Sequence, residues 1–322
     1  MLPRELEKRG VLGINARNQR YTLRVNERRF YPLVDDKLAS KRMCQEAGIP
    51  VPRLLAVAEV HAQAKRLLPQ LSGESAFVLK PARGAMGNGI LVIEMREGRM
   101  LRGSRVVSEE DFIYHAAGII SGLYSLAGHA DAAMVEEKLI THPEIAPLAV
   151  DGVPDVRVIV YRGIPVMAMM RLPTAASGGR ANLHQGALGV CIDLELGVTT
   201  HAMFRGTTIA KHPDNQRALV GFAIPSFDEV LTTAVSAAGR SGLGYVGADV
   251  VIDARLGPSI LELNARPGLA IQLANRAGLG PRLDAVDEAL GPWERGEPND
   301  LSTEARVALG CAVAHAARPR AA

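Results

Sequence analysis

Two carboxylates and an amide near residue 260 have the types and spacing of a magnesium site. The segment SILELNARPG predicts a strand in which Glu262 and Asn264, two residues apart, point to the same face. The segment GADVVID before it predicts the preceding strand, and a hairpin between the two would bring Asp249 opposite them. Carboxylate and amide oxygens are the hard ligands that suit Mg²⁺ beside phosphates. Taken alone, Glu-x-Asn on a strand is a weak signal, so the prediction depends on the residues around it.

A lysine followed by a glycine-rich turn predicts a phosphate cradle. Lys80 ends the apolar strand AFVLK and precedes the turn RGAMGNG. Three glycines of this turn would let backbone N–H groups approach a phosphate closely, namely Gly84, Gly87 and Gly89. Lys37 opens a predicted helix, whose N-terminal amides add to its positive charge. The alternatives are a turn that binds nothing and an exposed lysine.

Further polar residues follow along the chain. Glu137, Lys138 and Leu139 end the predicted strand AMVEEKLI, whose backbone edge would match the edge of adenine, and Glu144 could bind ribose hydroxyls. Near a triphosphate, arginines such as Arg157, Arg171 and Arg180 would stabilise the charge of a transferring phosphoryl group.

Ordinary explanations stand beside these predictions. A surface ion pair between Asp155 and Arg157 is one alternative for the arginine motif. His184, in the polar loop RANLHQG, is expected to order its loop, with general acid–base work as the minor alternative.

The elements that must position these residues alternate between strands and helices without βαβ units, which indicates an α+β fold. Asp35 is the predicted N-cap of a helix DKLASKRMCQEA that ends at Gly48. We expect strands at 76–80 and 90–95, a Ser-capped helix from 108, and a hairpin over 155–172 turning at Arg162-Gly163. A helix over 226–244, a hairpin over 247–268 and a helical tail from about 285 follow. GAMGNG has the wrong order for a dinucleotide fingerprint, so a Rossmann fold is rejected.

Composition narrows the class of protein. The chain has 322 residues, 48% hydrophobic and 22% charged, which is typical of globular proteins. No apolar run reaches the roughly 18 residues of a membrane span, and MLPRELEKRG lacks a signal-peptide core, so the expected location is the cytoplasm. Cys44, Cys191 and Cys311 show neither a disulfide framework nor a zinc spacing, and are expected to be reduced. With 4% aromatic residues, nucleic-acid stacking platforms are not expected.

The first residues carry a strong positive charge. Residues 1–42 hold eleven Lys and Arg against five Asp and Glu, a local charge of +6 in a chain of net charge +3. We expect residues 1–34 to be an irregular basic arm with a small hairpin in YTLRVNERRFYPLV. Such an arm suits an acidic substrate, a phosphate surface or nucleic acid, and a solvated face is the alternative.

The order of these motifs is specific even though each is weak. DDKLASK…GIPVP, FVLKPARGAMGNGI, MVEEKL, DVRVIV, RANLHQGA and GADVVID…ILELNARPG together resemble the ATP-grasp superfamily, over roughly residues 35–285. The resemblance is nearest to the RimK-related, alpha-L-glutamate ligase-like group, and D-alanine–D-alanine ligases share much of it. It implies an ATP-grasp fold of two α+β lobes with ATP between them.

The resemblance also implies roles for single residues. Lys37 and Lys80 match the phosphate-binding lysines, and Gly84, Gly87 and Gly89 match the loop that covers the phosphates. Glu137, Lys138 and Leu139 match the adenine connector, Glu144 the ribose acid, and Leu261 a residue against adenine. Arg157, Arg180 and Asn182 match residues beside the phosphates, Gly268 lies near the acyl site, and the implied metal ligands are Asp249, Glu262 and Asn264.

Three departures leave the two substrates open. The usual N-terminal α/β domain is absent or reduced to the basic arm, Gln185 stands where the ribosomal-tail ligases tend to have Arg, and ARPGLAIQLANRAGL replaces a glutamate-containing stretch. The expected division is a basic arm at 1–34, an N-lobe at 35–135, a C-lobe at 136–285 and a helical tail at 286–322. We hypothesise that the arm binds an acidic acceptor such as a peptide, through charged candidates Arg17, Arg20, Arg24, Arg28 and Arg29.

The activity implied by the resemblance is ATP-dependent ligation. A carboxylate would form an acyl phosphate and then an amide with an amine, as in the addition of glutamate to a peptide or small acceptor. The expected cofactors are ATP and two Mg²⁺ ions, with Mn²⁺ as a substitute, and a homo-oligomer is compatible with the sequence. The alternatives are an ATP-grasp enzyme acting on a sugar-linked or cell-envelope precursor, and an ATP-binding regulatory protein without turnover.

Overall fold

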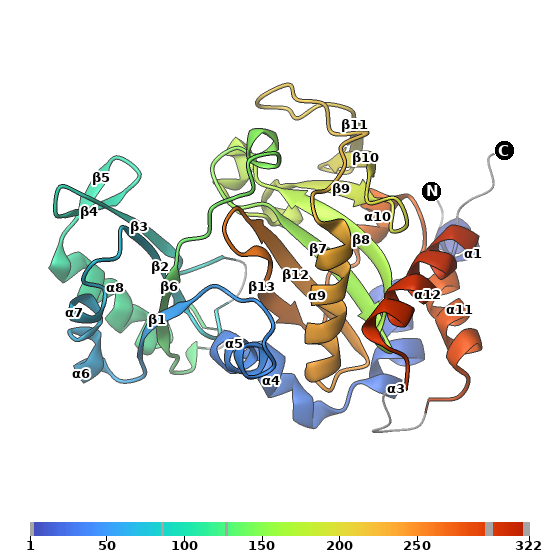
Figure 1. Cartoon of the computed structure of the whole chain (residues 1–322), viewed down its shortest axis with the longest axis horizontal. Helices are drawn as coiled ribbons and strands as arrows, with labels where there is room; N and C mark the ends of the chain where they lie inside the picture. The colour runs from blue at the N-terminus through green and yellow to red at the C-terminus, as the bar shows by residue number, and fades with distance from the viewer. Residues whose placement is uncertain (1–2, 85–86, 126–127, 294–298, 318–322) are drawn as a thin grey trace. The chain divides into compact units, whose positions relative to one another are not determined.

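Two antiparallel sheets organise the chain, each with its own helices (Figure 1). The computed structural model describes residues 3–84, 87–125, 128–293 and 299–317. The chain divides into two units, of which the smaller holds Asp36–Ala39 and Val51–Leu139 and the larger holds the remainder. The mixed α+β class predicted from the sequence is confirmed. The predicted arm, lobes and tail stay a prediction, and 294–298 and 318–322 of that tail lie outside the described residues.

The sheet of the smaller unit has six strands in the order β1-β6-β2-β3-β4-β5. Their bounds are β1 Leu54–Ala58, β2 Ala76–Pro81, β3 Leu91–Arg96, β4 Arg99–Arg102, β5 Arg105–Val107 and β6 Ala133–Glu137. The predicted strands at 76–80 and 90–95 are confirmed as β2 and β3. The strand predicted at 133–140 is β6, which ends at Glu137, so 138–140 lie after the strand. Alternate residues of β2, Phe77 and Leu79, are buried in the core, so Lys80 lies on the other face of the sheet.

Three helices belong to the smaller unit, α6 His61–Ala64, α7 Leu67–Gln70 and α8 Glu109–Ile120. Helix α8 packs Phe112 edge-on against Phe77, with ring centroids 5.9 Å apart. Its predicted cap is confirmed, because Ser108 Oγ accepts a hydrogen bond of 3.0 Å from the backbone N–H of Asp111.

The sheet of the larger unit has seven strands in the order β11-β10-β9-β8-β7-β12-β13. Their bounds are β7 Asp155–Tyr161, β8 Ile164–Leu172, β9 Leu188–Ile192, β10 Thr199–Phe204, β11 Thr207–Ile209, β12 Tyr245–Asp253 and β13 Gly257–Asn264. The hairpins predicted over 155–172 and 247–268 are confirmed. The first turns at Arg162 and Gly163, with φ of 51° and 80°, and two left-handed residues of this kind match the right-handed twist of the strands.

Helices cover the larger sheet. The predicted helix over 226–244 is α9 Phe227–Arg240, which packs across β7, β12 and β13 (Figure 1). The others are α10 Ala270–Asn275, α11 Gly280–Leu290 and α12 Thr303–Ala316, with short 3-10 turns η4 Ala146–Leu148, η5 Ala175–Ser177 and η6 Leu183–Gln185. Side chains of β7, α10 and α11 share one core with Leu12, Tyr21 and Val25 of the N-terminal segment.

The N-terminal segment is helical, so the predicted irregular arm with a hairpin is wrong. Its elements are α1 Pro3–Lys8, α2 Ile14–Arg17, the π-helical turn η1 Asn18–Thr22, α3 Leu23–Val25, the 3-10 turn η2 Arg28–Phe30 and α4 Tyr31–Asp35. Tyr21 and Val25 are buried four residues apart, which is the spacing of one helical face. Burial of this helical face on the larger sheet therefore selects helices where the sequence suggested a small hairpin.

Helix α5, Lys37–Glu46, begins one residue later than predicted. Asp35 ends α4, and the cap is Asp36, whose Oδ1 accepts from the backbone N–H groups of Leu38 and Ala39 at 2.9 and 3.1 Å. Gly48 adopts the left-handed conformation expected after a helix, with φ of 68°. None of the described helices is long and apolar enough to cross a membrane.

We predict that Ser108→Ala lowers the free energy of unfolding of the smaller unit by about 1 kcal/mol, because the first turn of α8 loses its cap. Urea unfolding followed by circular dichroism measures the change. The control is Ser104→Ala, which alters an exposed serine in the preceding turn. Equal stability of the two variants would contradict the assignment of the cap.

Candidate functional site

Three adjacent strands of the larger sheet bring four of the predicted site residues together. Asp249 on β12 lies opposite Glu262 on β13 and opposite Arg157 on β7. Asn264 lies two pairs further along, opposite Gly247. The amide Nδ2 of Asn264 is 3.2 Å from Asp249 Oδ2 and 3.3 Å from Glu262 Oε1. The hairpin predicted from the sequence therefore produces the expected cluster of two carboxylates and an amide.

Two arginines hold the Asp249 carboxylate. Arg157 donates from Nε and Nη2 to its two oxygens, each at 2.7 Å, and Arg171 Nη2 donates to Oδ2 at 2.6 Å. Arg171 in turn makes two bonds of 2.6 Å to Asp155. The sequence named Arg171 as an arginine that would stabilise phosphoryl charge and Asp155 as an ion-pair partner of Arg157, but it did not predict that these two residues pair with each other. A signal existed in their opposite charges, since Asp155 lies directly opposite Arg171 in the predicted hairpin.

Burial and the arginines act in opposite directions on the two aspartates. Burial would raise the pKa of Asp249, but Arg157 and Arg171 outweigh it and hold that pKa well below its ordinary value. For Asp155, burial prevails over the attraction of Arg171 and raises its pKa to about 6. Burial lowers the pKa of Arg171, and the two aspartates more than offset it, so the pKa of this guanidinium is raised. The arginines therefore favour the charged form of Asp249, whereas burial disfavours the charged form of Asp155.

The donor set fits Mg²⁺ through its chemistry. Asp249, Glu262 and Asn264 supply hard oxygens from one face of the β12–β13 hairpin. To act as a ligand, Asn264 must turn its Oδ1 rather than its Nδ2 toward the metal, which is a rotation of its amide. The described residues contain no group of three His, Cys, Asp or Glu side chains that could hold a metal ion, and the predicted set has two carboxylates and one amide.

The other predicted residues of the larger unit lie in loops or at the strand end. Arg180 is exposed, and no ion pair of its side chain occurs among the described residues. Asn182 caps η6, since its Oδ1 accepts from the backbone N–H of His184 at 2.9 Å. This contact orders the loop through the backbone of His184, and the expected role of the His184 side chain stays a prediction. Leu261 is half-buried on β13, and Gly268 is exposed after it.

In the smaller unit, Lys80 is a buried cation with a buried partner. Its Nζ pairs with Glu136 Oε1, and the two side chains are 6% and 4% exposed. Both residues project from the face of the sheet opposite α8, from the adjacent strands β2 and β6. Glu136 was not predicted, although it lies one residue before the connector. A buried pair of this kind fixes the position of the lysine ammonium group.

The glycine-rich turn is in contact with the other predicted lysine. Lys37 Nζ donates to the carbonyl oxygen of Gly84 at 2.6 Å. A Cβ at Gly84 would lie 2.2 Å from Pro81, and Gly87 and Gly89 have φ of 73° and 77°, so all three positions require glycine. Residues 85–86 of the turn lie outside the described residues.

Side chains that the sequence did not predict anchor both ends of this turn. Asp131 is 4% exposed and accepts from the backbone N–H groups of Arg83 and Ala132 at 3.0 and 2.7 Å. His115 Nε2 lies 2.9 Å from the carbonyl oxygen of Gly89, and the His115 ring stacks on Tyr124. No motif marks these residues, because their contacts depend on how α8 packs.

The predicted connector is ordered by contacts inside the smaller unit. Glu137 Oε1 accepts from the backbone N–H of Arg53 at 2.7 Å, and Lys138 Nζ pairs with Glu94 at 2.5 Å. Leu139 is buried and is the last residue of this unit. Glu144 belongs to the larger unit and is exposed.

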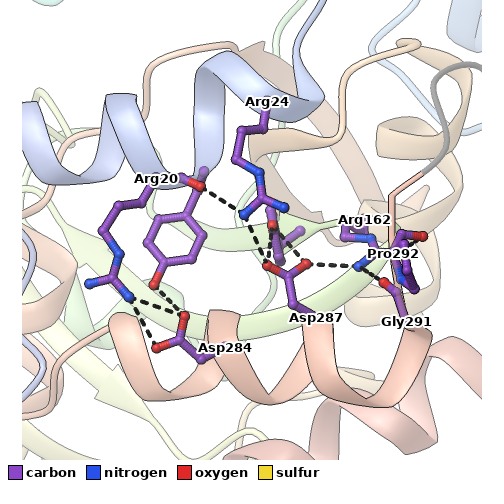
Figure 2. A network of polar contacts seen from close by, with 9 residues as sticks. Arg20, Arg24, Arg162, Asp284, Asp287, Gly291 and Pro292 are labelled. Atoms are coloured by element: carbon purple, nitrogen blue, oxygen red, sulfur yellow. Dashed lines mark hydrogen bonds and ion pairs between the residues drawn. The ribbon is translucent and has the colours of Figure 1, made fainter.

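The arginines of the N-terminal segment are arranged differently from the expected acceptor-binding arm. Arg17 is only 4% exposed, and Arg20 and Arg24 pair with Asp284 and Asp287 of α11 at 3.3 and 3.9 Å (Figure 2). The expectation that these arginines form an open acidic-acceptor site is therefore wrong for Arg17, because packing on the larger sheet covers it. Arg28 and Arg29 are exposed, and Arg29 pairs with Glu27.

Comparison with solved structures gives similar but distant proteins. The ATP-grasp ligase PsnB complexed with a minimal precursor is 18% identical, with 82% of this chain and 63% of that chain covered and a TM-score of 0.44. A Chryseobacterium gregarium RiPP-associated ATP-grasp ligase in complex with ADP and a leader and core peptide is 12% identical, with coverage of 85% and 65% and a TM-score of 0.45. The D-alanine–D-alanine ligase from Coxiella burnetii is 13% identical, with coverage of 91% and 62% and a TM-score of 0.42.

The chain spans less than two thirds of the length of these solved proteins. No curated protein matches the sequence. A family model described as sugar-transfer associated ATP-grasp matches residues 16–288, which is most of the chain. The ATP-grasp fold expected from the sequence is thereby confirmed, whereas the RimK-related group is not singled out. The chain belongs to the sugar-transfer associated ATP-grasp family.

Proposed function

We propose that this protein is an ADP-forming ligase that uses ATP to join a carboxylate to an amine. The observation that carries the proposal is the cluster on β7, β12 and β13, where Asp249, Glu262 and Asn264 face two buried arginines. Substrate carboxylate oxygen attacks the γ-phosphorus, the bond to ADP breaks, and an acyl phosphate forms. The amine nitrogen then attacks the acyl carbon, releases phosphate and loses a proton. In such a reaction the protein mainly positions the reacting groups and neutralises the charge of the phosphates.

The smaller unit supplies the groups proposed to bind the nucleotide. Lys80, held by Glu136, and Lys37, held at the glycine-rich turn, are placed to offer positive charge to phosphates. Gly84, Gly87 and Gly89 leave the backbone of the turn open to phosphate oxygens. We assign the adenine edge to Glu137, Lys138 and Leu139 of this unit. Leu261 and Glu144 belong to the larger unit, and their proposed roles toward the base and the ribose rest on the resemblance alone.

The larger unit supplies the groups proposed to act at the transferred phosphoryl group. Glu262, Asn264 and Asp249 would hold two Mg²⁺ ions, for which Mn²⁺ could substitute. When bound, these ions would neutralise the charge of the phosphate oxygens. Arg157 is held in place by its two bonds to Asp249, so its orientation is set before substrate arrives. Arg180 and Asn182 are proposed to contact the γ-phosphate from the loop after β8.

The family description favours one class of acceptor. An association with sugar transfer points to a sugar-linked or cell-envelope precursor as one of the two substrates, a peptide or amino acid being the other candidate. An ATP-dependent reaction and three free cysteines are compatible with the cytoplasmic location expected from the sequence. A screen of ADP release with pooled sugars, amino acids and peptides, followed by product mass, tests the activity and identifies both substrates.

We predict that Glu262→Ala lowers the ligation rate at least roughly 10²-fold, the scale for one group that stabilises charge in a transition state. The same variant should lose the Mg²⁺ dependence of binding to a non-hydrolysable ATP analogue, measured by calorimetry. Glu229→Ala, an exposed glutamate on α9, is the control and should match the wild type. Folded Glu262→Ala with unaltered Mg²⁺-dependent binding and turnover would refute the metal assignment.

We predict that Lys80→Met has two separable effects. Removing one member of a buried ion pair should cost roughly 3–5 kcal/mol of stability, because Glu136 keeps its charge inside the protein. The double variant Lys80→Met/Glu136→Gln should recover most of that stability. If the ammonium group binds phosphate, however, the double variant should still bind the ATP analogue at least tenfold more weakly.

Calorimetric titration and thermal unfolding of both variants separate these effects. Lys80→Arg keeps the charge with a different geometry and should lie between wild type and Lys80→Met in affinity. Wild-type affinity in the stable double variant would show that Lys80 serves the fold alone.

A further inference from the structure

Arg17, at the end of α2, is a buried cation whose contacts include no carboxylate among the described residues. Its Nη1 donates to the carbonyl oxygen of Pro267 at 3.0 Å, and its Nε donates to Asn18 Oδ1 at 2.8 Å. The guanidinium lies 5.6 Å from the centre of the Tyr245 ring. The residue is 4% exposed. Its positive charge is thus directed at the peptide backbone that follows the candidate metal strand.

The contact fixes the peptide bond between Pro267 and Gly268. The described peptide bonds include no cis bond, so the carbonyl of Pro267 and the N–H of Gly268 point in opposite directions. With Arg17 on the carbonyl oxygen, the N–H of Gly268 points away from Arg17. Gly268 is exposed, and its N–H has no acceptor among the described residues. The result is an oriented hydrogen-bond donor four residues beyond Asn264.

Two other contacts hold the same turn. The Arg266 guanidinium lies 4.5 Å from the centre of the Tyr31 ring, on α4 of the N-terminal segment. Pro267 packs on Gly247, where an added Cβ would lie 2.7 Å from the proline Cβ. Gly247 is the residue opposite Asn264 in the β12–β13 register. The turn is therefore pressed against the strand that carries Asp249, and the N-terminal segment touches it at two successive residues.

The segment that carries Arg17 is itself firmly anchored. The Asn26 side chain pairs with the backbone of Tyr245 through bonds of 2.8 and 2.7 Å. Figure 2 shows the contacts with α11, including Arg20 with Asp284, and the Tyr21 hydroxyl donates to Asp284 at 2.6 Å. These anchors leave Arg17 little freedom to release the Pro267 carbonyl.

Stability does not explain a cation at this position. Burying a guanidinium costs several kcal/mol, and a nearby carboxylate would offset part of that cost. Arg171 has two such carboxylates, whereas Arg17 has a carbonyl oxygen, an amide oxygen and an aromatic ring. An apolar side chain of similar size would fill the same space at lower cost. We therefore expect a functional role of the Arg17 charge.

We propose that Arg17 is a positioning residue that holds the Pro267–Gly268 peptide and so presents the Gly268 N–H to the acyl group of the substrate. The inference rests on the proposed ligase function. When the amine adds to the acyl carbon, the carbonyl electron pair moves onto oxygen, and it returns as phosphate leaves. A cation bonded to the Pro267 oxygen polarises the peptide and strengthens its N–H as a donor to that oxyanion.

The test compares Arg17→Met and Arg17→Lys with a matched control, Arg282→Met. Arg282 is also buried and donates to a backbone carbonyl at 2.7 Å, that of Val166, which lies on β8 rather than on the turn. We expect Arg17→Met to lower kcat about tenfold to a hundredfold without changing ATP KM, and without lowering Tm. Arg17→Lys, which keeps a charged donor, should recover part of kcat.

Hydrogen exchange of the Gly268 and Leu269 amides gives a second readout that needs no turnover. Exchange there should rise in Arg17→Met and stay at the wild-type level in Arg282→Met. If Arg17→Met leaves kcat and this exchange unchanged, or if it lowers Tm and kcat as Arg282→Met does, the positioning role is overturned. If the wild type forms no amide with any substrate, the ligase proposal fails instead, and exchange alone still decides whether Arg17 orders the turn.

Discussion

The structure of the larger unit depends on how it satisfies one buried carboxylate. Asp249 is completely buried in the middle of β12, where an isolated negative charge would be far too costly to keep. Arg157 and Arg171 reach it from β7 and β8, and Asp155 completes the row by holding Arg171. Since removing any one member would leave the others uncompensated, the four residues must be understood as one group.

This group also explains why the candidate site is arranged before any ligand arrives. The two arginines and the three acids Asp155, Asp249 and Glu262 carry a net charge of −1, which suits a divalent cation next to them. The arginine donors are aligned by bidentate bonds, which restrict a planar guanidinium far more than a single contact would. A site of this kind can stabilise transferred phosphoryl charge without first reorganising its own dipoles.

Lys80 and Arg157 are held in the same way, although they lie in different units. Each is a buried cation matched with one principal acid, Glu136 for Lys80 and Asp249 for Arg157. In both cases the acid fixes the position of the positive charge. The sequence motifs predicted both cations, but they predicted the acid only for Arg157. Asp249 was predicted because it lies in a recognisable strand motif, whereas Glu136 was not predicted because it lies one residue before the connector at 137–139.

Sequence patterns predicted what depends on neighbours in the chain. The hairpin turning at Arg162 and Gly163, the cap at Ser108 and the facing of Asp249 and Glu262 all follow from local periodicity and turn chemistry. The contact of Arg171 with Asp249 was not predicted, because it joins two strands that are not adjacent, β8 and β12. Such a contact depends on the order of strands in the sheet, which no local pattern specifies.

In the N-terminal segment a local pattern was present, but it predicted the wrong structure. The segment YTLRVNERRFYPLV suggested a small hairpin, yet the burial of Tyr21 and Val25 on the larger sheet selects a helix. The positive charge of the segment was read as a free surface, yet Arg20 and Arg24 meet the acids of α11 while Arg17 turns inward. Net charge predicts what a surface attracts only after packing has decided which charges remain on it.

Two kinds of buried arginine contact β12, those paired with acids and Arg17, which is paired with none among the described residues. On a single face, Asp249 receives guanidinium groups that are neutralised by acids, and four residues earlier Tyr245 lies beneath a guanidinium that no acid neutralises. Between them, Gly247 supports Pro267 and faces Asn264. The neutralised arginines hold acids in place, whereas the charge of Arg17 acts on a carbonyl and, through that peptide, on the N–H beyond it. A fold that keeps an unneutralised cation at this point retains a stability cost whose benefit must lie in the orientation of the turn.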